Sequence, residues 1–202
     1  MGGASGRLTA WPPLAKWPAA SPTNCASRST IERQVAAADR VITALNDFAR
    51  LPIPQLEPVG VDTCLREVLE INAPPPGVEL DLFVNPPDLC VLGDRTQLAI
   101  VFANLVRNAR DAMPEGGRLR VTAVGEGELV AISFEDSGVG IPPDVLPHIL
   151  EPLYSTKAKG IGLGLSIAHD IVRRHHGTLT VTSQLGKGST FTVRLNACDR
   201  SS

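Results

Sequence analysis

The sequence has little net charge and no long apolar run. Its formal net charge is −2 over 202 residues, so electrostatics give no reason to expect nucleic acid as a partner. No apolar segment reaches the roughly 18 residues that a helix needs to span a bilayer, and the N-terminus has no apolar core of the secretory type. We therefore expect no membrane segment in this chain and a cytoplasmic location.

Cysteine is scarce, and a P-loop is absent. No two cysteines have the spacing of a metal site or a redox motif, so we expect reduced thiols, as in a cytoplasmic protein. The stretch 186–189, Gly-Lys-Gly-Ser, lacks the Gly-Lys-Ser/Thr order of a P-loop. Any phosphate site must therefore be built in another way. The cysteines are Cys25, Cys64, Cys90 and Cys198.

Changes of composition divide the chain into four segments. Residues 1–28 are rich in Gly, Ala, Ser and Pro without periodicity, and we expect them to be disordered or foreign to the fold. Residues 29–50 repeat apolar side chains at spacings of four and three, which predicts a bundle helix. A single helix is marginal in water, so it should either dimerise or dock on the chain's own domain. Residues 51–60 predict a linker, and residues 61–197 predict one domain.

Residues 61–197 alternate between helical and strand-like periodicity. The order is helix, two strands, helix, two strands, loop, helix, two strands, which predicts an α+β fold. We expect a two-layer α/β sandwich in which three helices cover one face of a mixed sheet. Asp62 or Thr63 should cap the first helix and Asp94 the second, and Gly177 should end the third as a left-handed C-cap. The expected strands are residues 78–84, 89–92, 118–124, 129–135, 179–183 and 190–195.

Three alternating glycines open the third helix. Gly160, Gly162 and Gly164 permit positive φ and a close backbone approach to a ligand. The helix that follows directs unpaired N–H groups toward the same place, which suits phosphate without a basic side chain. A flexible turn would have the same composition.

The second helix aligns two amides and a carboxylate. Asn104, Asn108 and Asp111 are four and three residues apart, so they share one face, while the opposite side is apolar. Magnesium takes oxygen ligands and keeps several waters, and this face suits such an ion. The alternative is a solvent-exposed polar face without a ligand.

Two further motifs lie between these helices. Asp136 follows a strand and can accept a hydrogen bond from an exocyclic amine, while Gly138 and Gly140 let the backbone close around a flat ring whose apolar walls would be Ile141 and Leu165. The alternative is a tight turn. Residues 151–157 contain an aromatic, two hydroxyls and a lysine. They suit a lid that orders on ligand binding, or else form a surface loop.

As a set, these motifs resemble the catalytic ATP-binding domain of sensor histidine kinases, which has the Bergerat (GHKL) fold. The resemblance covers about residues 30–196, and residues 29–50 resemble the second helix of the family's dimerisation and phosphoacceptor domain. The matching motifs are the asparagine box at Asn104–Met113, the first glycine box at Asp136–Gly140, the phenylalanine box at Pro152–Lys157, the second glycine box at Gly160–Leu165 and the closing strand at Gly188–Phe191.

The resemblance implies ATP and Mg²⁺ as ligands. Asn108 would bind the magnesium ion, with Asn104 beside it in the catalytic site, and Asp136 would bind the adenine amine. The glycines of residues 160–164 would hold the phosphates and form the hinge of the lid. The residues that the resemblance places at the nucleotide are Asn108, Asp111, Asp136, Gly138, Gly140, Ile141, Tyr154, Lys157, Gly160, Gly162, Leu163, Gly164, Leu165 and Thr190.

The resemblance favours phosphoryl transfer to a protein over hydrolysis. ATPases of this fold usually have a glutamate where this chain has Asn104, and an amide is a poor general base. Asp111, in contrast, resembles the ATPase version of the box. The alternatives are a GHKL-type ATPase, a serine/threonine kinase of the anti-sigma type, and a nucleotide-dependent interaction module without catalysis.

The family's phosphoacceptor context is missing from this sequence. Its four histidines lack the His-Glu/Asp-x-x-Pro pattern, and none lies in residues 29–50. We therefore expect a kinase fragment that binds ATP, does not phosphorylate itself, and acts in trans on a histidine helix of a partner. A response regulator is expected downstream, and residues 29–50 offer a homodimer contact. The histidines are His148, His169, His175 and His176.

Overall fold

The computed structural model describes residues 52–154 and 162–198. The chain divides into two compact units, residues 1–43 and 44–202, and all described residues belong to the second. No helix in the described ranges is long and apolar enough to cross a membrane.

Several expectations lie outside the described residues. These are the disordered segment 1–28, the bundle helix 29–50, and the placement of Lys157 and Gly160 in the site.

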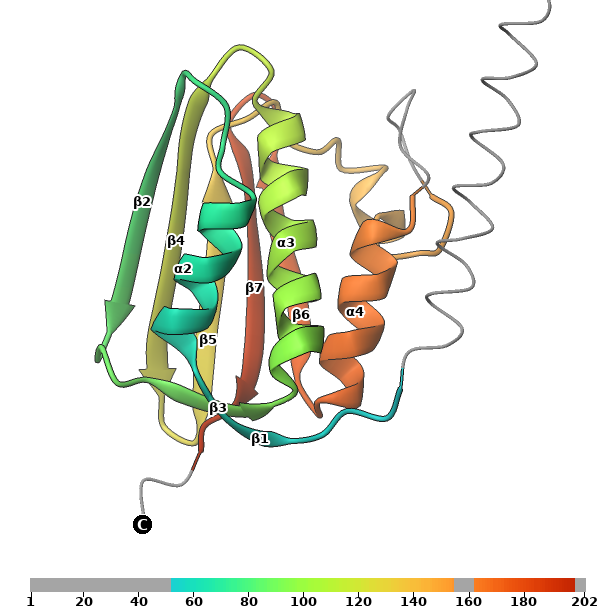
Figure 1. Cartoon of the computed structure of the whole chain (residues 1–202). Coiled ribbons are helices and arrows are strands. Elements are labelled where there is room, and N and C mark those ends of the chain that lie inside the picture. Colours follow the sequence, from blue (N-terminus) through green and yellow to red (C-terminus); the bar gives the residue numbers. More distant parts are fainter. Residues whose placement is uncertain (1–51, 155–161, 199–202) are drawn as a thin grey trace, which may run out of the picture. The chain divides into compact units, whose positions relative to one another are not determined.

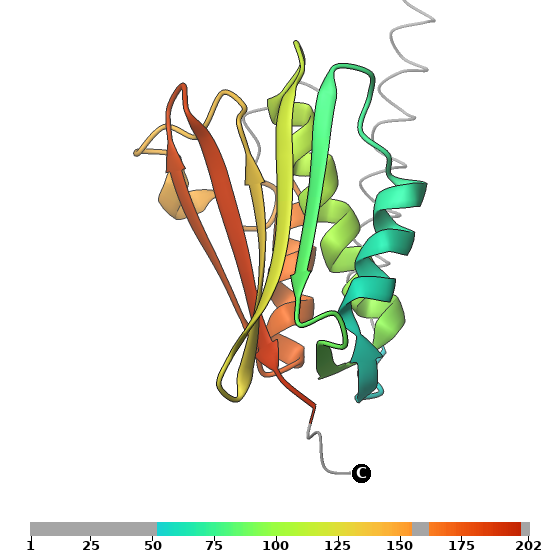
Figure 2. The same ribbon diagram turned by 90° about the vertical axis from the view of Figure 1, so that its left-hand side faces the viewer.

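Five strands form one mixed sheet, and three helices cover one of its faces (Figure 1 and Figure 2). The strand order is β2-β4-β5-β7-β6. β2 pairs parallel to β4, and the other neighbours pair antiparallel. This arrangement confirms the predicted two-layer α+β sandwich. The strands are β2 (Val78–Asn85), β4 (Gly117–Glu126), β5 (Leu129–Asp136), β6 (Thr178–Gln184) and β7 (Gly188–Asn196).

A second sheet has two short strands. β1 (Glu57–Gly60) pairs antiparallel with β3 (Cys90–Gly93). β1 therefore lies in residues 51–60, which were predicted to be a linker. Its pairing partner is distant in sequence, and four residues are too few to show a periodicity of their own.

The central helix is α3 (Arg95–Ala112), whose apolar side packs on the sheet. Asp94 caps it as predicted, because its Oδ1 accepts the N–H of Gln97 at 3.1 Å. Phe102 of α3 packs against Phe134 of β5 with ring centroids 5.8 Å apart. This packing fixes which side of α3 is buried.

The first helix, α2 (Val61–Ile71), begins earlier than expected. Its N-cap is Gly60, which forms no side-chain cap. The N–H of Val61 instead donates to the C=O of Leu89 at 2.9 Å. The prediction that Asp62 or Thr63 caps this helix is therefore wrong, because a distant carbonyl satisfies the first N–H group.

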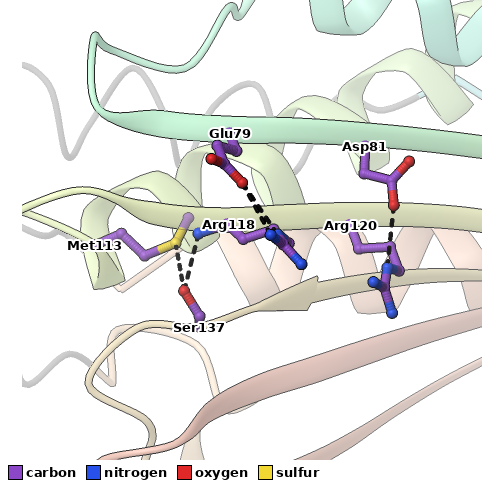
Figure 3. A network of polar contacts seen from close by, with 6 residues as sticks. All are labelled: Glu79, Asp81, Met113, Arg118, Arg120 and Ser137. Atoms are coloured by element: carbon purple, nitrogen blue, oxygen red, sulfur yellow. Dashed lines mark hydrogen bonds and ion pairs between the residues drawn. The ribbon is translucent and has the colours of Figure 1, made fainter.

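The open face of the sheet carries charged pairs across neighbouring strands (Figure 3). Glu79 of β2 lies 3.0 Å from the guanidinium of Arg118 of β4, and Asp81 lies 3.2 Å from that of Arg120. Exposed pairs of this kind contribute roughly 0–1 kcal/mol each. These pairs show which face of the sheet is exposed to solvent, and their contribution to stability is small.

The last helix, α4 (Gly164–Arg174), ends in a Schellman motif. The N–H of Gly177 donates to the C=O of Val172, and the N–H of His176 donates to the C=O of Arg173. The left-handed residue is His176, with φ 57°, so the prediction of a left-handed Gly177 is wrong. Gly177 is needed for space instead, because a Cβ there would collide with the C=O of Arg194.

The expectation of reduced thiols is wrong for two of the four cysteines, and Cys25 lies outside the described residues. Cys90 and Cys198 form a disulfide, which joins β3 to the residues after β7. Their large separation in sequence hides the pair from any local spacing rule. Cys64 is a free, buried thiol of α2, and burial raises its pKa to about 11. It therefore stays protonated at neutral pH.

Replacing His176 by glycine should stabilise the domain by about 1 kcal/mol, because glycine enters the left-handed region without the steric cost of a side chain. Urea denaturation followed by circular dichroism measures the change. His169→Gly, the same substitution inside α4, is the matched control and should destabilise by about 1 kcal/mol. An unchanged or lower midpoint for His176→Gly would contradict this description of the helix end.

Candidate nucleotide-binding site

The predicted motifs meet at one end of the sheet, where α3 ends and α4 begins. The N–H of Val139 donates to the C=O of Ala112 at 3.0 Å, which attaches the loop after β5 to the end of α3. Asp136, the last residue of β5, lies opposite Ser189 of β7. Motifs that are far apart in sequence thus share one site.

Asp136 is the buried carboxylate of this site, with 2% of its surface exposed. Its Oδ1 accepts the N–H of Gly138 at 2.9 Å, which closes a tight turn directly after the strand. A buried carboxylate held in this way is a strong acceptor for the N–H group of a ligand. The tight turn and the ligand acceptor, which the sequence left as alternatives, are therefore compatible.

Gly138 and Gly140 are needed because the loop runs against other backbone segments. A Cβ on Gly138 would collide with the C=O of Ala112, and one on Gly140 with the C=O of Gln184. Gly140 also has a positive φ of 69°. The next residue, Ile141, donates its N–H to Ser183 Oγ at 2.8 Å. The two glycines shape the pocket by allowing these close approaches.

The asparagine box lies against the second glycine box. Asn104 Nδ2 donates to the C=O of Ile100 at 3.0 Å, and a Cβ built on Gly164 would lie 3.0 Å from Asn104 Oδ1. Asn108 is half-buried on the same helix, and Asp111 is exposed, 3.8 Å from the Arg110 guanidinium. The Asn104 side chain therefore lies against the start of α4.

The first turn of α4 is suited to an anion. Its N-cap residue is Leu163, which is buried and provides no side-chain cap. The positive end of the helix dipole and the N–H groups of the first turn favour an anion at this position. Leu165 and Ile141 are half-buried and pack against the core.

Leu153 and Gly162 lie side by side. The N–H of Leu153 donates to the C=O of Gly162 at 3.1 Å. Both residues have positive φ, 65° for Leu153 and 75° for Gly162, a conformation that is costly for leucine. Tyr154 contacts the ring of His148, with centroids 5.6 Å apart. The described parts of the phenylalanine box and the second glycine box are thus in direct backbone contact.

The structure does not bring Thr190 to the site. Side chains alternate along β7, and the neighbouring Phe191 is buried on the helix side of the sheet, so Thr190 faces the open side. Ser189, which the sequence analysis did not select, lies at the site instead: it is 5% exposed, lies opposite Asp136, and its Oγ is 3.0 Å from Ser183 Oγ. The alternation of buried residues from Phe191 onward could have revealed it.

Comparison with known proteins places these observations in one family. Residues 93–198 match the model described as histidine kinase-, DNA gyrase B- and HSP90-like ATPase. Sensor histidine kinase ZraS of Escherichia coli (strain K12) is 38% identical over 160 residues, which cover 78% of this chain and 34% of that protein. Sporulation kinase C of Bacillus subtilis (strain 168) is 39% identical over 163 residues, which cover 77% and 38%. The chain spans little more than a third of the length of these relatives.

Solved structures of histidine kinases have a similar fold. The nucleotide-free catalytic domain of histidine kinase ThkA superposes with a TM-score of 0.62 at 28% identity, over 70% of this chain and 95% of that chain. Full-length ShkA in complex with AMPPNP superposes with a TM-score of 0.68 at 28% identity, over 85% of this chain and 39% of that one. The resemblance to sensor histidine kinases that the motifs indicated is confirmed.

Asp136→Asn should weaken ATP binding about 10- to 100-fold, because a hydrogen bond to a charged acceptor is worth roughly 1.5–3 kcal/mol. Isothermal titration calorimetry measures the affinity, and circular dichroism checks the fold. Glu135→Gln is the matched control, since this adjacent carboxylate is exposed and lies on the opposite face of the sheet. Unchanged affinity in a folded Asp136→Asn variant would exclude this carboxylate from the pocket.

Proposed function

Because the chain belongs to the family of histidine kinase-, DNA gyrase B- and HSP90-like ATPases, we propose that it binds ATP and transfers the γ-phosphoryl group to a histidine of a partner protein. The observation that carries this proposal is the position of Asn104 against Gly164. It brings an amide, rather than a general base, to the end of the site where the phosphates would bind.

The described residues fit ATP and Mg²⁺ at three points. The buried Asp136 can accept a hydrogen bond from the adenine amine, and N–H groups at the start of α4, which has no side-chain cap, can donate to phosphate oxygens. The amide oxygens of Asn104 and Asn108 suit a magnesium ion that keeps most of its ligands as water and phosphate. When bound, Mg-ATP supplies the phosphoryl group together with the cation that neutralises its charge.

The amide of Asn104 favours phosphoryl transfer to a protein over hydrolysis. Hydrolysis requires a group that removes a proton from water, and a neutral amide is a poor base. The hydrogen bond from Nδ2 to the C=O of Ile100 also restrains the orientation of this side chain. The site can therefore position a nucleotide but lacks a base at Asn104 to activate water. This favours transfer to a nucleophilic side chain of a protein over hydrolysis.

None of the histidines in this sequence is a suitable acceptor. His175 is buried and uses both ring nitrogens in hydrogen bonds. His148 Nδ1 lies 2.9 Å from Glu151 Oε1, His169 is half-buried in α4, and His176 belongs to the end of that helix. We infer that the acceptor histidine lies on a helix of a partner, with residues 29–50 as the dimer contact, and that a response regulator receives the phosphoryl group afterwards.

Mixing the chain with γ-labelled ATP, magnesium and a sensor-kinase fragment that carries a His-Glu-x-x-Pro helix should label the fragment. Phosphohistidine is acid-labile, so acid treatment should remove the label. The chain alone should stay unlabelled. The Asp136→Asn variant and a fragment lacking the histidine serve as controls.

The other outcomes distinguish the alternatives. Acid-stable label on the fragment would indicate a serine/threonine kinase, and rapid release of labelled phosphate without transfer would indicate an ATPase. Measured ATP binding with neither transfer nor release would indicate a nucleotide-dependent interaction module. Each of these results would overturn the proposed histidine kinase activity.

Asn108→Ala should remove most of the magnesium-dependent tightening of ATP binding, a loss of about tenfold or roughly 1.4 kcal/mol. Calorimetry with magnesium and with EDTA measures the difference. Asn196→Ala is the matched control, because this exposed amide lies at the opposite end of β7. If magnesium tightened binding equally in Asn108→Ala, the metal would be held elsewhere.

A further inference from the structure

His175 forms a hydrogen-bonded link between the two helices of the site. It follows the last residue of α4 and has 1% of its surface exposed. Its Nδ1 lies 2.8 Å from the C=O of Ile171, and its Nε2 lies 2.9 Å from the N–H of Asp94. A carbonyl can only accept and an N–H can only donate, so Nδ1 carries the proton and Nε2 is the acceptor. The two partners therefore fix one neutral tautomer.

Asp94 is the residue that starts α3. Its Oδ1 accepts the N–H of Gln97, and its C=O accepts the N–H of Leu98 at 2.8 Å. Its Oδ2 also accepts the N–H of Gln55 at 3.2 Å. The bond from Asp94 to His175 therefore joins the end of α4 to the first turn of α3 and to the segment that leads into the domain.

The two helices have matching lengths between this link and the site. α3 and α4 run antiparallel, since the end of α4 meets the start of α3. About ten residues separate Asp94 from Asn104, and about eleven separate Gly164 from His175, which correspond to roughly 15 Å and 16 Å at 1.5 Å per residue. Fixing the helices at His175 therefore brings Gly164 level with Asn104, where a Cβ would lie 3.0 Å from Asn104 Oδ1.

We propose that His175 is a positioning residue of the nucleotide site, because it sets the axial register of α4 against α3. An axial slip of α4 would carry Gly164 and the first turn away from the asparagine box. Gly93 lies beside the ring, since a Cβ there would lie 3.2 Å from His175 Cδ2 and 2.6 Å from Leu98 Cδ1. The effect on ATP rests on the proposed function, whereas the effect on helix register does not.

Two substitutions that differ by one methylene separate the roles of the two ring nitrogens. His175→Asn can still donate to the C=O of Ile171 but is too short to reach Asp94. His175→Gln can place its carbonyl oxygen near the position of Nε2 and accept the N–H of Asp94. His169→Asn, on the same helix and away from Asp94, is the matched control.

The first readout is the amide NMR spectrum without nucleotide. His175→Asn should shift the signals of the Gly164 N–H, at the far end of α4, and of the Asn104 side-chain amide, in the middle of α3. The second readout is the affinity for AMPPNP, which should fall about five- to tenfold, the effect of one lost hydrogen bond. His175→Gln should restore both readouts, and His169→Asn should leave both unchanged.

Other results would overturn the proposal. Shifts confined to the surroundings of Asp94, with unchanged AMPPNP affinity, would make His175 an ordinary packing residue. So would equal losses in His175→Asn and His175→Gln, or a His175→Asn variant that fails to fold while His175→Gln folds. If the wild-type chain did not bind AMPPNP, the proposed function would fail, and the shifts of Gly164 and Asn104 would still decide the positioning role.

Discussion

The packing of α3 against the sheet is the constraint on which the site depends. Its buried residues include Leu98, Phe102 and Leu105, and each large apolar side chain removed from water contributes roughly 1.5–3 kcal/mol. A rotation of α3 that moved the amides would expose this apolar side. The direction in which Asn104 and Asn108 point is therefore a consequence of core formation. Burial of apolar side chains, rather than contacts of the two asparagines themselves, stabilises this orientation of α3.

The glycines of the site act mainly by allowing backbone segments to approach one another. Gly138 lies against the end of α3, Gly140 against the end of β6, and Gly164 against Asn104. The sequence pattern suggested glycines that contact a ligand, whereas these contacts are within the chain. The two uses are related, because a pocket for a flat ring and a row of phosphates can form only where several backbones meet without intervening side chains.

Local periodicity accounts for the parts of the structure that the sequence could predict. The strands and the cap at Asp94 follow from alternation, helical spacing and hydrogen bonding between near neighbours. The residue types and order of the motifs indicated the protein family. Non-local contacts account for the rest. The parallel pairing of β2 with β4, the strand β1, the Cys90–Cys198 disulfide and the start of α2 at Val61 each depend on a partner far along the chain. Thr190 was chosen over Ser189 because a motif gives residue order but not the face of the strand.

α3 contacts different parts of the molecule at its two ends. Its start binds the segment before β1, and its second half carries the asparagine box of the site. At its start, Asp94 binds Gln55, and Gln97 Nε2 donates to the C=O of Pro52 at 2.9 Å. Toward its other end, α3 presents the asparagine box to α4. A helix hardly changes length, because its backbone hydrogen bonds fix the rise per residue. The hydrogen bonds of Asp94 and Gln97 therefore join the segment before β1 to the start of α3, and the hydrogen bond between Asp94 and His175 joins that start to the end of α4.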